Sequence, residues 1–242
     1  MDQINNIQYS NSQQDTLIKW IKSMPLSQKK CIRNILSVNS GNGNLDKQVI
    51  KLLPNIKNYY IIQSEYENYQ NCIQNLFGNF KFKVSYSDLF DYEIDPLISY
   101  DVIVFFDGFS DINECTTFIN CCSKFINENG KIWIFTHEDE GCINNVRNHF
   151  GLETYGDLTL KNKINDFKCK IFNTHIPTFT NVKDINTTCL SQLLRKRCSE
   201  EDIIKFRDFV LKNYGDYIQI PISVLILSNI RIEDKDCTYI NI

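Results

Sequence analysis

Two glycines, separated by a single residue, follow a short apolar run in the segment Val38-Asn39-Ser40-Gly41-Asn42-Gly43. The run from Ile35 to Val38 has the composition of a strand, and a helical pattern begins at Asn44. Glycine allows the backbone to approach a ligand closely, and the first turn of a helix presents N–H groups that have no partner within the helix. This strand, turn and helix therefore predict a binding site made of backbone atoms.

The spacing of the glycines limits which ligand the turn can take. A dinucleotide fingerprint needs a further glycine or small residue three positions after Gly43, so that the helix and the strand pack closely. Asp46 occupies that position. Its carboxylate is also unfavourable beside a pyrophosphate, because two anions repel each other. We therefore expect a nucleoside ligand that carries no pyrophosphate.

The elements that must position this turn follow from the alternation of apolar runs with longer helical patterns, which is typical of a parallel sheet covered by helices. We expect strands at 34–38, 59–63, 81–86, 102–106, 131–136, 168–174 and 219–227. We expect helices at 45–53, 65–77, 112–126, 142–150, 190–197 and 201–213, and a short amphipathic helix from Thr16 to before Pro25. The predicted fold class is α/β, with a Rossmann-like, seven-stranded, mostly parallel sheet and helices on both faces.

The expected domain organisation is simple. Residues 1–30 are predicted to be an N-terminal tail followed by a helix that can serve as a lid. Residues 31–242 are predicted to form a single domain with a helical elaboration near residues 186–213, because no linker or break in composition divides them.

The segment from Leu36 to Ile50, which reads Leu-Ser-Val-Asn-Ser-Gly-Asn-Gly-Asn-Leu-Asp-Lys-Gln-Val-Ile, resembles the first motif of class I S-adenosylmethionine-dependent methyltransferases. It is most similar to the form found in the histamine N-methyltransferase family, and the likeness covers roughly residues 32–230. The resemblance implies a methyltransferase fold, S-adenosylmethionine as cofactor, S-adenosylhomocysteine as product and a small amine as acceptor. Asn39 stands where glycine is usual, but asparagine tolerates a positive φ, so we expect the turn to survive.

Methyltransferases of this class usually end the second strand with an acidic residue that binds both ribose hydroxyls, and Gln63 holds that position here. Glu65 is the alternative. However, Ser64-Glu65-Tyr66-Glu67 has the pattern of a capping box, which would place Glu65 in the first turn of a helix. We therefore expect Gln63 to bind the ribose, with weaker hydrogen bonds than a charged acceptor makes.

The resemblance also implies the remaining cofactor contacts, at the ends of the first four strands. Ser87 and Asp88 border the adenine and can accept from its exocyclic amine, although the same residues suit an ordinary loop. Phe106 is expected against the adenine or the methionine part. The full set of expected cofactor residues is Asn39, Ser40, Gly41, Gly43, Gln63, Asn68, Ser87, Asp88 and Phe106.

Methyl transfer from a sulfonium is an in-line displacement, so the protein must mainly align the acceptor and exclude water. An amine must be unprotonated when it attacks, and a nearby acid can orient it or carry its proton away. Asp107 is the expected catalytic residue, the alternative being a turn aspartate before Gly108. His137 is a second catalytic candidate. The acceptor is expected to contact Trp20, Asp107, His175 and Gln219.

Composition excludes several other classes. A formal net charge of −3 provides no global positive field, so we expect neither nucleic acid nor membrane as a partner. The N-terminal residues lack the features of a secretory signal, which predicts a cytoplasmic protein, and we expect a monomer. The ten cysteines are scattered without a C-x-x-C motif, so we interpret them as small buried hydrophobic residues and expect no metal site.

Two alternatives remain open. The acceptor atom can be an oxygen or a carboxylate on the same fold with a changed pocket. From a different functional class, the departures at Asn39 and Gln63 are also those expected of a catalytically silent protein that binds S-adenosylmethionine or S-adenosylhomocysteine and regulates a partner.

Overall fold

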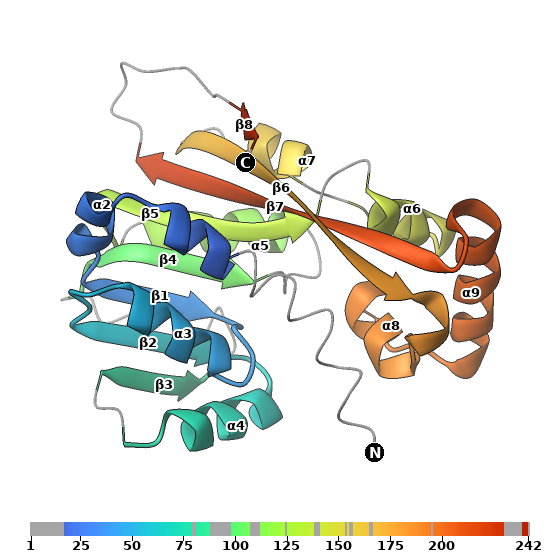
Figure 1. The fold of residues 1–242 in the computed structure, drawn as a ribbon, viewed down its shortest axis with the longest axis horizontal. Helices are drawn as coiled ribbons and strands as arrows, with labels where there is room; N and C mark the ends of the chain where they lie inside the picture. The colour runs from blue at the N-terminus through green and yellow to red at the C-terminus, as the bar shows by residue number, and fades with distance from the viewer. Residues whose placement is uncertain are drawn as a thin grey trace.

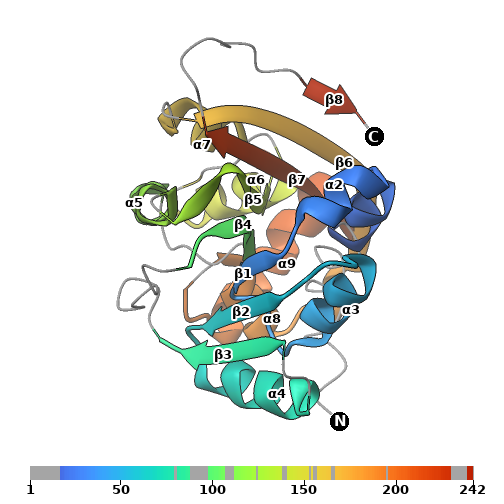
Figure 2. The same ribbon diagram turned by 90° about the vertical axis from the view of Figure 1, so that its left-hand side faces the viewer.

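Eight strands form one sheet in the order β3-β2-β1-β4-β5-β7-β6-β8 in a computed structural model of the chain. The structure describes residues 17–78, 81–87, 98–106, 112–123, 125–137, 141–152, 154, 157–164, 167–194, 196–229 and 239–241. Figure 1 shows the sheet between layers of helices, and Figure 2 shows α2 and α3 on one side of it and α5 on the other.

The strands run in parallel over the first five members of the sheet, and the direction then changes. They are β1 (Asn34–Val38), β2 (Asn58–Gln63), β3 (Phe82–Tyr86), β4 (Tyr100–Phe106), β5 (Ile126–His137), β6 (Phe167–Asn181), β7 (Tyr217–Asn229) and β8 (Tyr239–Asn241). Strand β7 is antiparallel to both β5 and β6, and β8 is parallel to β6. The predicted Rossmann-like, mostly parallel fold is confirmed.

The helices occupy the connections between these strands. Residues 17–23 form an N-terminal helix, as expected. The others are α2 (Leu26–Cys31), α3 (Asn44–Leu52), α4 (Tyr66–Leu76), α5 (Ile112–Ser123), α6 (Cys142–His149), α7 (Asp157–Lys163), the 3₁₀ helix η1 (Val182–Asp184), α8 (Thr187–Leu194) and α9 (Glu200–Tyr214). Within the described ranges, no helix has the length and apolar character needed to cross a bilayer.

The differences from the expected elements are local. The sheet has an eighth strand, β8, whose three residues carry no recognisable pattern and pair only with β6. The helix expected at 112–126 ends at Ser123, because Ile126 already pairs with Tyr100 as the start of β5. Helices α2, α7 and η1 were not expected, since each is too short for an apolar period to be recognised.

Alternate residues of the strands pack into two different cores. Ile35 of β1 faces the N-terminal helix and α3, where it joins a cluster that includes Leu45 and Val49. Leu36 faces the opposite side and joins a cluster that includes Ile119 of α5. The helices on the two sides of the sheet therefore hold β1, and with it the turn that follows, between two apolar layers.

A third core lies away from the sheet, among α6, α8, α9 and the distal ends of β6 and β7. Its members include Ile143, Val182, Leu190, Phe206 and Ile218. The pairing of β5 with β7 stops at His137 and Ile222, whereas β6 and β7 remain paired as far as Asn181 and Tyr217. The two strands thus continue past the sheet as a ribbon that carries this helical layer (Figure 1). The division into a tail at 1–30 and a single domain at 31–242 stays a prediction.

The interpretation of the cysteines as buried is only partly correct. Cys72 and Cys122 are buried, but Cys31 and Cys121 are exposed. Cys122 packs in the core cluster that includes Ile119, whereas the preceding residue of α5, Cys121, lies outside that cluster and is exposed.

Candidate functional site

The candidate site lies where the parallel strands end. Strands β1 to β5 all point toward the side of the molecule that carries α6, α8 and α9, as Figure 1 shows. Ligands in open α/β sheets bind at this carboxyl edge, because the loops and helix N-termini converge there.

The turn after β1 takes the conformation that its sequence predicts. Asn39 has a φ of 55°, and Gly41 and Gly43 have φ values of 85° and 82°. The N–H of Asn39 donates to the carbonyl of Ile62 (2.9 Å). The Asn39 Oδ1 accepts from the backbone N–H (3.2 Å) and the hydroxyl (3.1 Å) of Ser64. The asparagine thus both adopts the positive φ and fastens the turn to the end of β2.

The two glycines of the turn have different surroundings. A Cβ on Gly43 would lie 2.9 Å from Cys72 Sγ and 3.2 Å from Leu76 Cδ1, so α4 packs directly against this residue. A Cβ on Gly41 would have no neighbour within 4 Å among the described residues. Gly43 is therefore required by packing, whereas Gly41 faces open space at the carboxyl edge.

A buried chain of hydrogen bonds supports the turn from beneath. Gln63 is 1 % exposed, and its Nε2 donates to the carbonyl of Gly41 (2.7 Å) and to Ser40 Oγ (3.3 Å). Ser40 Oγ in turn donates to Asp46 Oδ2 (2.6 Å). Because an amide N–H only donates, the direction of these bonds is set by Gln63 at one end.

Asp46 ends this chain in a fully buried position. Burial raises the pKa of its carboxyl group, and the hydroxyls of Ser40, Ser37 and Tyr59 partly offset that rise. Burial also raises the pKa of the Cys72 thiol to about 12, with the neighbouring Asp46 charge as a second cause. The carboxylate is therefore directed into the protein, and it acts on the turn through the Ser40 hydroxyl.

The capping box expected at Ser64 and Glu67 is wrong. Helix α4 begins after Glu65, which occupies the N-cap position without a side-chain cap, because the Ser64 hydroxyl is bonded to Asn39 instead. The Glu65 side chain is exposed, and its Oε2 accepts from Asn68 Nδ2 (2.8 Å). The end of β2 thus presents Glu65 and Asn68 to solvent, while Gln63 is covered.

Ser87 lies beside these residues at the end of β3. It is half-buried, and its N–H donates to the carbonyl of Gln63 (3.2 Å). The rings of Tyr66 and Tyr86 meet edge to face next to it, with centroids 5.5 Å apart. Asp88, the other residue expected near the adenine, lies outside the described residues.

The structure separates Trp20 from the turn. Trp20 is 8 % exposed and packs edge to face on Trp133 of β5, with ring centroids 4.4 Å apart. It belongs to the core between the N-terminal helix and the sheet. A residue covered in this way is available to an acceptor only if the N-terminal helix moves.

The remaining candidates are placed by their backbones alone. Phe106 is the last residue of β4 and is in register with Phe135. His137 pairs with Ile222 of β7, and Ile222 also pairs with Thr174 of β6. His175 follows Thr174 in the irregular stretch before Thr178, and Gln219 pairs with Phe179 on the ribbon. His137 and His175 therefore come from strands on either side of β7 at the same level, and Asp107 lies outside the described residues.

The structure thus brings Ser40, Gly41 and Gln63 into direct contact, and Ser87 joins them through its backbone. Asn39 lies in the same turn and is bonded to Ile62 and Ser64. Sequence reasoning missed the role of Asp46, whose six-residue separation from Ser40 was the available signal. Its assignment of the ribose contact to Gln63 in preference to Glu65 stays a prediction. Among the described residues, no group of three or more histidine, cysteine, aspartate or glutamate side chains is placed to hold a metal ion.

Comparison with known proteins identifies the fold. No protein-family model and no curated protein matches the chain. Among solved structures, the YcgJ protein from Bacillus subtilis superposes with a TM-score of 0.59 at 14 % identity, over 91 % of this chain and 99 % of that one. A putative sarcosine dimethylglycine methyltransferase from Galdieria sulphuraria gives 0.57 at 13 % identity, over 88 % and 84 %.

The N-methyltransferase NodS from Bradyrhizobium japonicum, solved with S-adenosylhomocysteine, gives a TM-score of 0.53 at 12 % identity, over 89 % of this chain and 86 % of that one. At such identities the likeness concerns the fold alone. The chain thus has the Rossmann-like α/β fold found in these methyltransferases.

Proposed function

We propose that the protein transfers a methyl group from S-adenosylmethionine to a small-molecule acceptor, the nitrogen of a small amine, with S-adenosylhomocysteine as the product. The observation that carries this proposal is the turn from Asn39 to Gly43. Its backbone is held in a left-handed conformation at the carboxyl edge, and Gly41 faces open space there. Helix α3 starts at this point, and although the N–H of its first residue, Asn44, donates to Asn42 Oδ1 (3.1 Å), the positive end of the helix dipole favours a ligand carboxylate there.

The exposed end of β2 supports the position of the ribose. Glu65 is exposed there and is bonded to the half-buried Asn68, whereas the Gln63 amide nitrogen is engaged by Gly41 and Ser40. We propose that Glu65 contacts the ribose hydroxyls and that Gln63 acts behind it, by holding the Gly41 carbonyl. Ser87 is proposed to border the adenine, because it lies next to Gln63 on the neighbouring strand.

When it is bound, S-adenosylmethionine supplies an electrophilic methyl group. The protein's own task is to align the acceptor, exclude water and receive a proton. We propose Asp107 as the residue that orients the acceptor nitrogen and takes its proton, because in the sequence it directly follows Phe106, the last residue of β4. His137, at the end of β5, is proposed as a second base, and His175 and Gln219 as acceptor contacts on the neighbouring strands.

The nature of two neighbours supports nitrogen as the acceptor atom. NodS is an N-methyltransferase. Coclaurine N-methyltransferase superposes on this chain with a TM-score of 0.51 at 12 % identity, over 90 % of this chain and 72 % of that one. Its structure was solved with N-methylheliamine and S-adenosylhomocysteine.

Titration calorimetry with S-adenosylmethionine and S-adenosylhomocysteine, followed by turnover assays over a panel of small amines, tests the proposal. We expect binding of both compounds and release of S-adenosylhomocysteine with at least one amine. If neither compound binds, the proposed function is wrong.

A second candidate function is a catalytically silent protein that binds the same nucleoside. The burial of Gln63 favours it, because a side chain committed to the protein's own backbone leaves one fewer ligand for the ribose. Binding of S-adenosylhomocysteine without turnover of any amine, alcohol or carboxylate acceptor would support this candidate over the enzyme.

A further inference from the structure

Basic residues are concentrated between Leu17 and Lys57. This part of the chain holds eight of the 26 lysines and arginines but only one of the 29 acidic residues, Asp46. Asp46 is fully buried, so no acidic side chain of this segment reaches solvent. A local excess of positive charge therefore exists in a chain whose formal net charge is −3.

Seven of these cations form one surface, which we call the basic face. It consists of Lys19, Lys22, Lys29, Lys30, Arg33, Lys51 and Lys57, of which Lys29 is half-buried and the others are exposed. The N-terminal helix, α2 and α3, which carry five of them, lie on the same side of the sheet (Figures 1 and 2).

Hydrogen bonds keep the parts of the basic face side by side. Lys29 Nζ donates to the carbonyl of Lys22 (3.0 Å), which joins α2 to the N-terminal helix. Asn55 Nδ2 donates to the carbonyl of Lys30 (2.8 Å). The N–H of Lys57 donates to the carbonyl of Arg33 (2.7 Å). Only the bond between Lys57 and Arg33 joins backbone to backbone, and it persists when those side chains are changed, whereas the bond from Lys29 Nζ is lost when Lys29 is replaced.

Acidic groups do not neutralise this surface in the described part of the chain, where no ion pair joins any of the seven cations to an acid. Asp101 is the acid in contact with Arg33, and it is half-buried. Its Oδ2 accepts from the backbone N–H groups of Arg33 (2.7 Å) and Asn34 (2.9 Å). Its charge is therefore used at the foot of β1, and Lys29 and Lys30 of α2 have no acidic partner among the described residues.

An apolar corner interrupts the basic face. Between the N-terminal helix and α2 the chain turns through Met24, Pro25 and Leu26, and Leu26 is 59 % exposed. Lys22 precedes this corner and Lys29 follows it. An exposed apolar side chain with exposed lysines close to it in the chain is an arrangement found where proteins rest on lipid headgroups.

We propose that the basic face docks onto a membrane surface rich in anionic lipid, with Leu26 entering the headgroup layer. Each lysine near such a surface raises the affinity for it about fivefold, so several lysines together suffice for binding. The net charge led to the opposite expectation because it averages over the whole chain, whereas a surface interacts only with charges within about a Debye length.

A lipid surface fits this face better than nucleic acid does. Proteins that track single strands combine cations with exposed aromatic rings on which bases stack. The large aromatic residues of the same elements, Trp20 and Tyr59, are buried. An exposed leucine corner, in contrast, contributes to lipid binding and adds nothing to a phosphate backbone.

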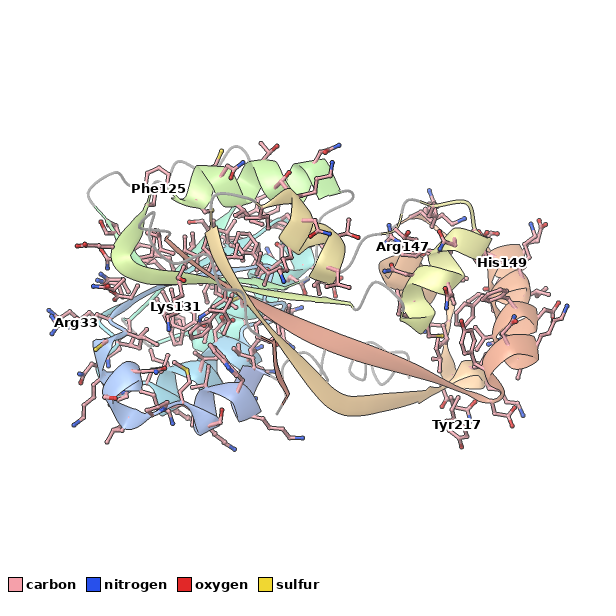
Figure 3. The ribbon with its side chains drawn as sticks, turned by 90° about the horizontal axis from the view of Figure 1, so that it is seen from above. Arg33, Phe125, Lys131, Arg147, His149 and Tyr217 are labelled. Carbon is pink, nitrogen blue, oxygen red and sulfur yellow. The ribbon has the colours of Figure 1, made fainter. Side chains whose placement is uncertain are left out.

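Docking in this way leaves the candidate site accessible. Figure 3 shows Arg33 at one end of the molecule and His149 and Tyr217, on the helical layer, at the other. The carboxyl edge of the sheet faces the helical layer, so the membrane and the acceptor would approach from different sides. The inference therefore does not depend on the proposed methyl transfer.

Vesicle sedimentation with the full chain tests the proposal. We expect binding to phosphatidylcholine vesicles that contain about 30 % phosphatidylserine, no binding to phosphatidylcholine alone, and loss of binding as salt is raised from about 0.1 M toward 1 M, where the Debye length falls to about 3 Å. The combined variant Lys22→Gln, Lys29→Gln and Lys30→Gln should bind at least tenfold more weakly. Leu26→Gln should weaken vesicle binding about threefold or more, since its apolar area no longer enters the headgroup layer.

A matched control removes the same net charge elsewhere. Lys163, Lys183 and Lys212 are exposed on α7, η1 and α9, and changing all three to glutamine should leave vesicle binding unaltered. Thermal unfolding of each variant checks that it is folded. Equal losses in both triple variants, or no binding of the unchanged protein to anionic vesicles, would overturn the proposal. Tighter binding to single-stranded RNA than to vesicles, abolished by the basic-face variant but not by Leu26→Gln, would assign the surface to nucleic acid instead.

Discussion

The different surroundings of Gly41 and Gly43 allow the roles of packing and ligand binding to be separated by two alanine substitutions. Both glycines have a positive φ, 85° and 82°, at which an alanine costs about 1–2 kcal/mol. At Gly43 the new methyl group would also meet Cys72 Sγ at 2.9 Å and Leu76 at 3.2 Å, and such overpacking adds about 1–3 kcal/mol. We therefore expect a loss of about 1–2 kcal/mol for Gly41→Ala and about 2–5 kcal/mol for Gly43→Ala.

These losses can be measured as changes in melting temperature. In a chain of this size, 1 kcal/mol corresponds to about 2–4 °C. Gly41→Ala should therefore lower Tm by about 2–8 °C and Gly43→Ala by about 4–20 °C. The affinity for S-adenosylhomocysteine should show the opposite order. Because Gly41 faces open space where we place the cofactor, its alanine should reduce that affinity at least tenfold, whereas folded Gly43→Ala should retain more of it.

Two results would refute this reasoning. If Gly41→Ala binds S-adenosylhomocysteine as tightly as the unchanged protein, the space at Gly41 is not the cofactor site. If Gly43→Ala is no less stable than Gly41→Ala, α4 does not pack against the turn as described. Cys72→Ala provides a check on the second point, because removing Sγ should make Gly43→Ala less costly in that background, a coupling that a double-mutant cycle measures.

Three further predictions concern the groups around the turn. Burial raises the folded-state pKa of Asp46, so the folded protein binds more protons than the unfolded chain, and the free energy of unfolding falls as pH rises from about 4 through that raised pKa. Denaturant unfolding at a series of pH values measures this fall, and Asp46→Asn should flatten it. An unchanged pH dependence in the variant would contradict the burial of the carboxyl group. Gln63→Ala should cost about 1–3 kcal/mol of stability, because it leaves the Gly41 carbonyl without its donor. Glu65→Ala should instead weaken the binding of S-adenosylhomocysteine by about 1 kcal/mol or more and leave Tm unchanged. If calorimetry finds no loss of binding for Glu65→Ala, the ribose contact returns to Gln63. Asp107→Ala should lower turnover more than tenfold with nearly unchanged cofactor affinity, and an unaltered rate in a single-turnover assay would remove it from the acceptor site.

The fold could be predicted because its main signals are local. The apolar run at 34–38 is β1 with the expected bounds, expected strands match β2, β3 and β4 to within two residues, and β5 begins five residues before its expected start. Strand length was harder to predict. β6 and β7 extend beyond the expected ranges because they pair with each other outside the sheet, and β8 exists only through its pairing with β6.

The same distinction applies to the candidate site. The turn, its positive φ at Asn39 and the backbone character of the site were readable from neighbouring residues, since each depends on steric limits within a few positions. The capping box was not, because the Ser64 hydroxyl is bonded to Asn39, which lies 25 positions away in the sequence. A local pattern fails where a distant partner competes for the same hydrogen bond.

What the sequence determined by itself was the order of strands β1 to β7 and of the longer helices, and the shape of one turn, because apolar periodicity and glycine conformation act over short stretches of chain. The tertiary structure alone decided that Gly43 serves packing, that Gln63 is buried and that Asp46 lies beneath the turn. It also gathered seven cations into one face of an acidic protein. Burial, close contact and the summation of charge depend on which distant segments meet, and that information is held in the folded arrangement.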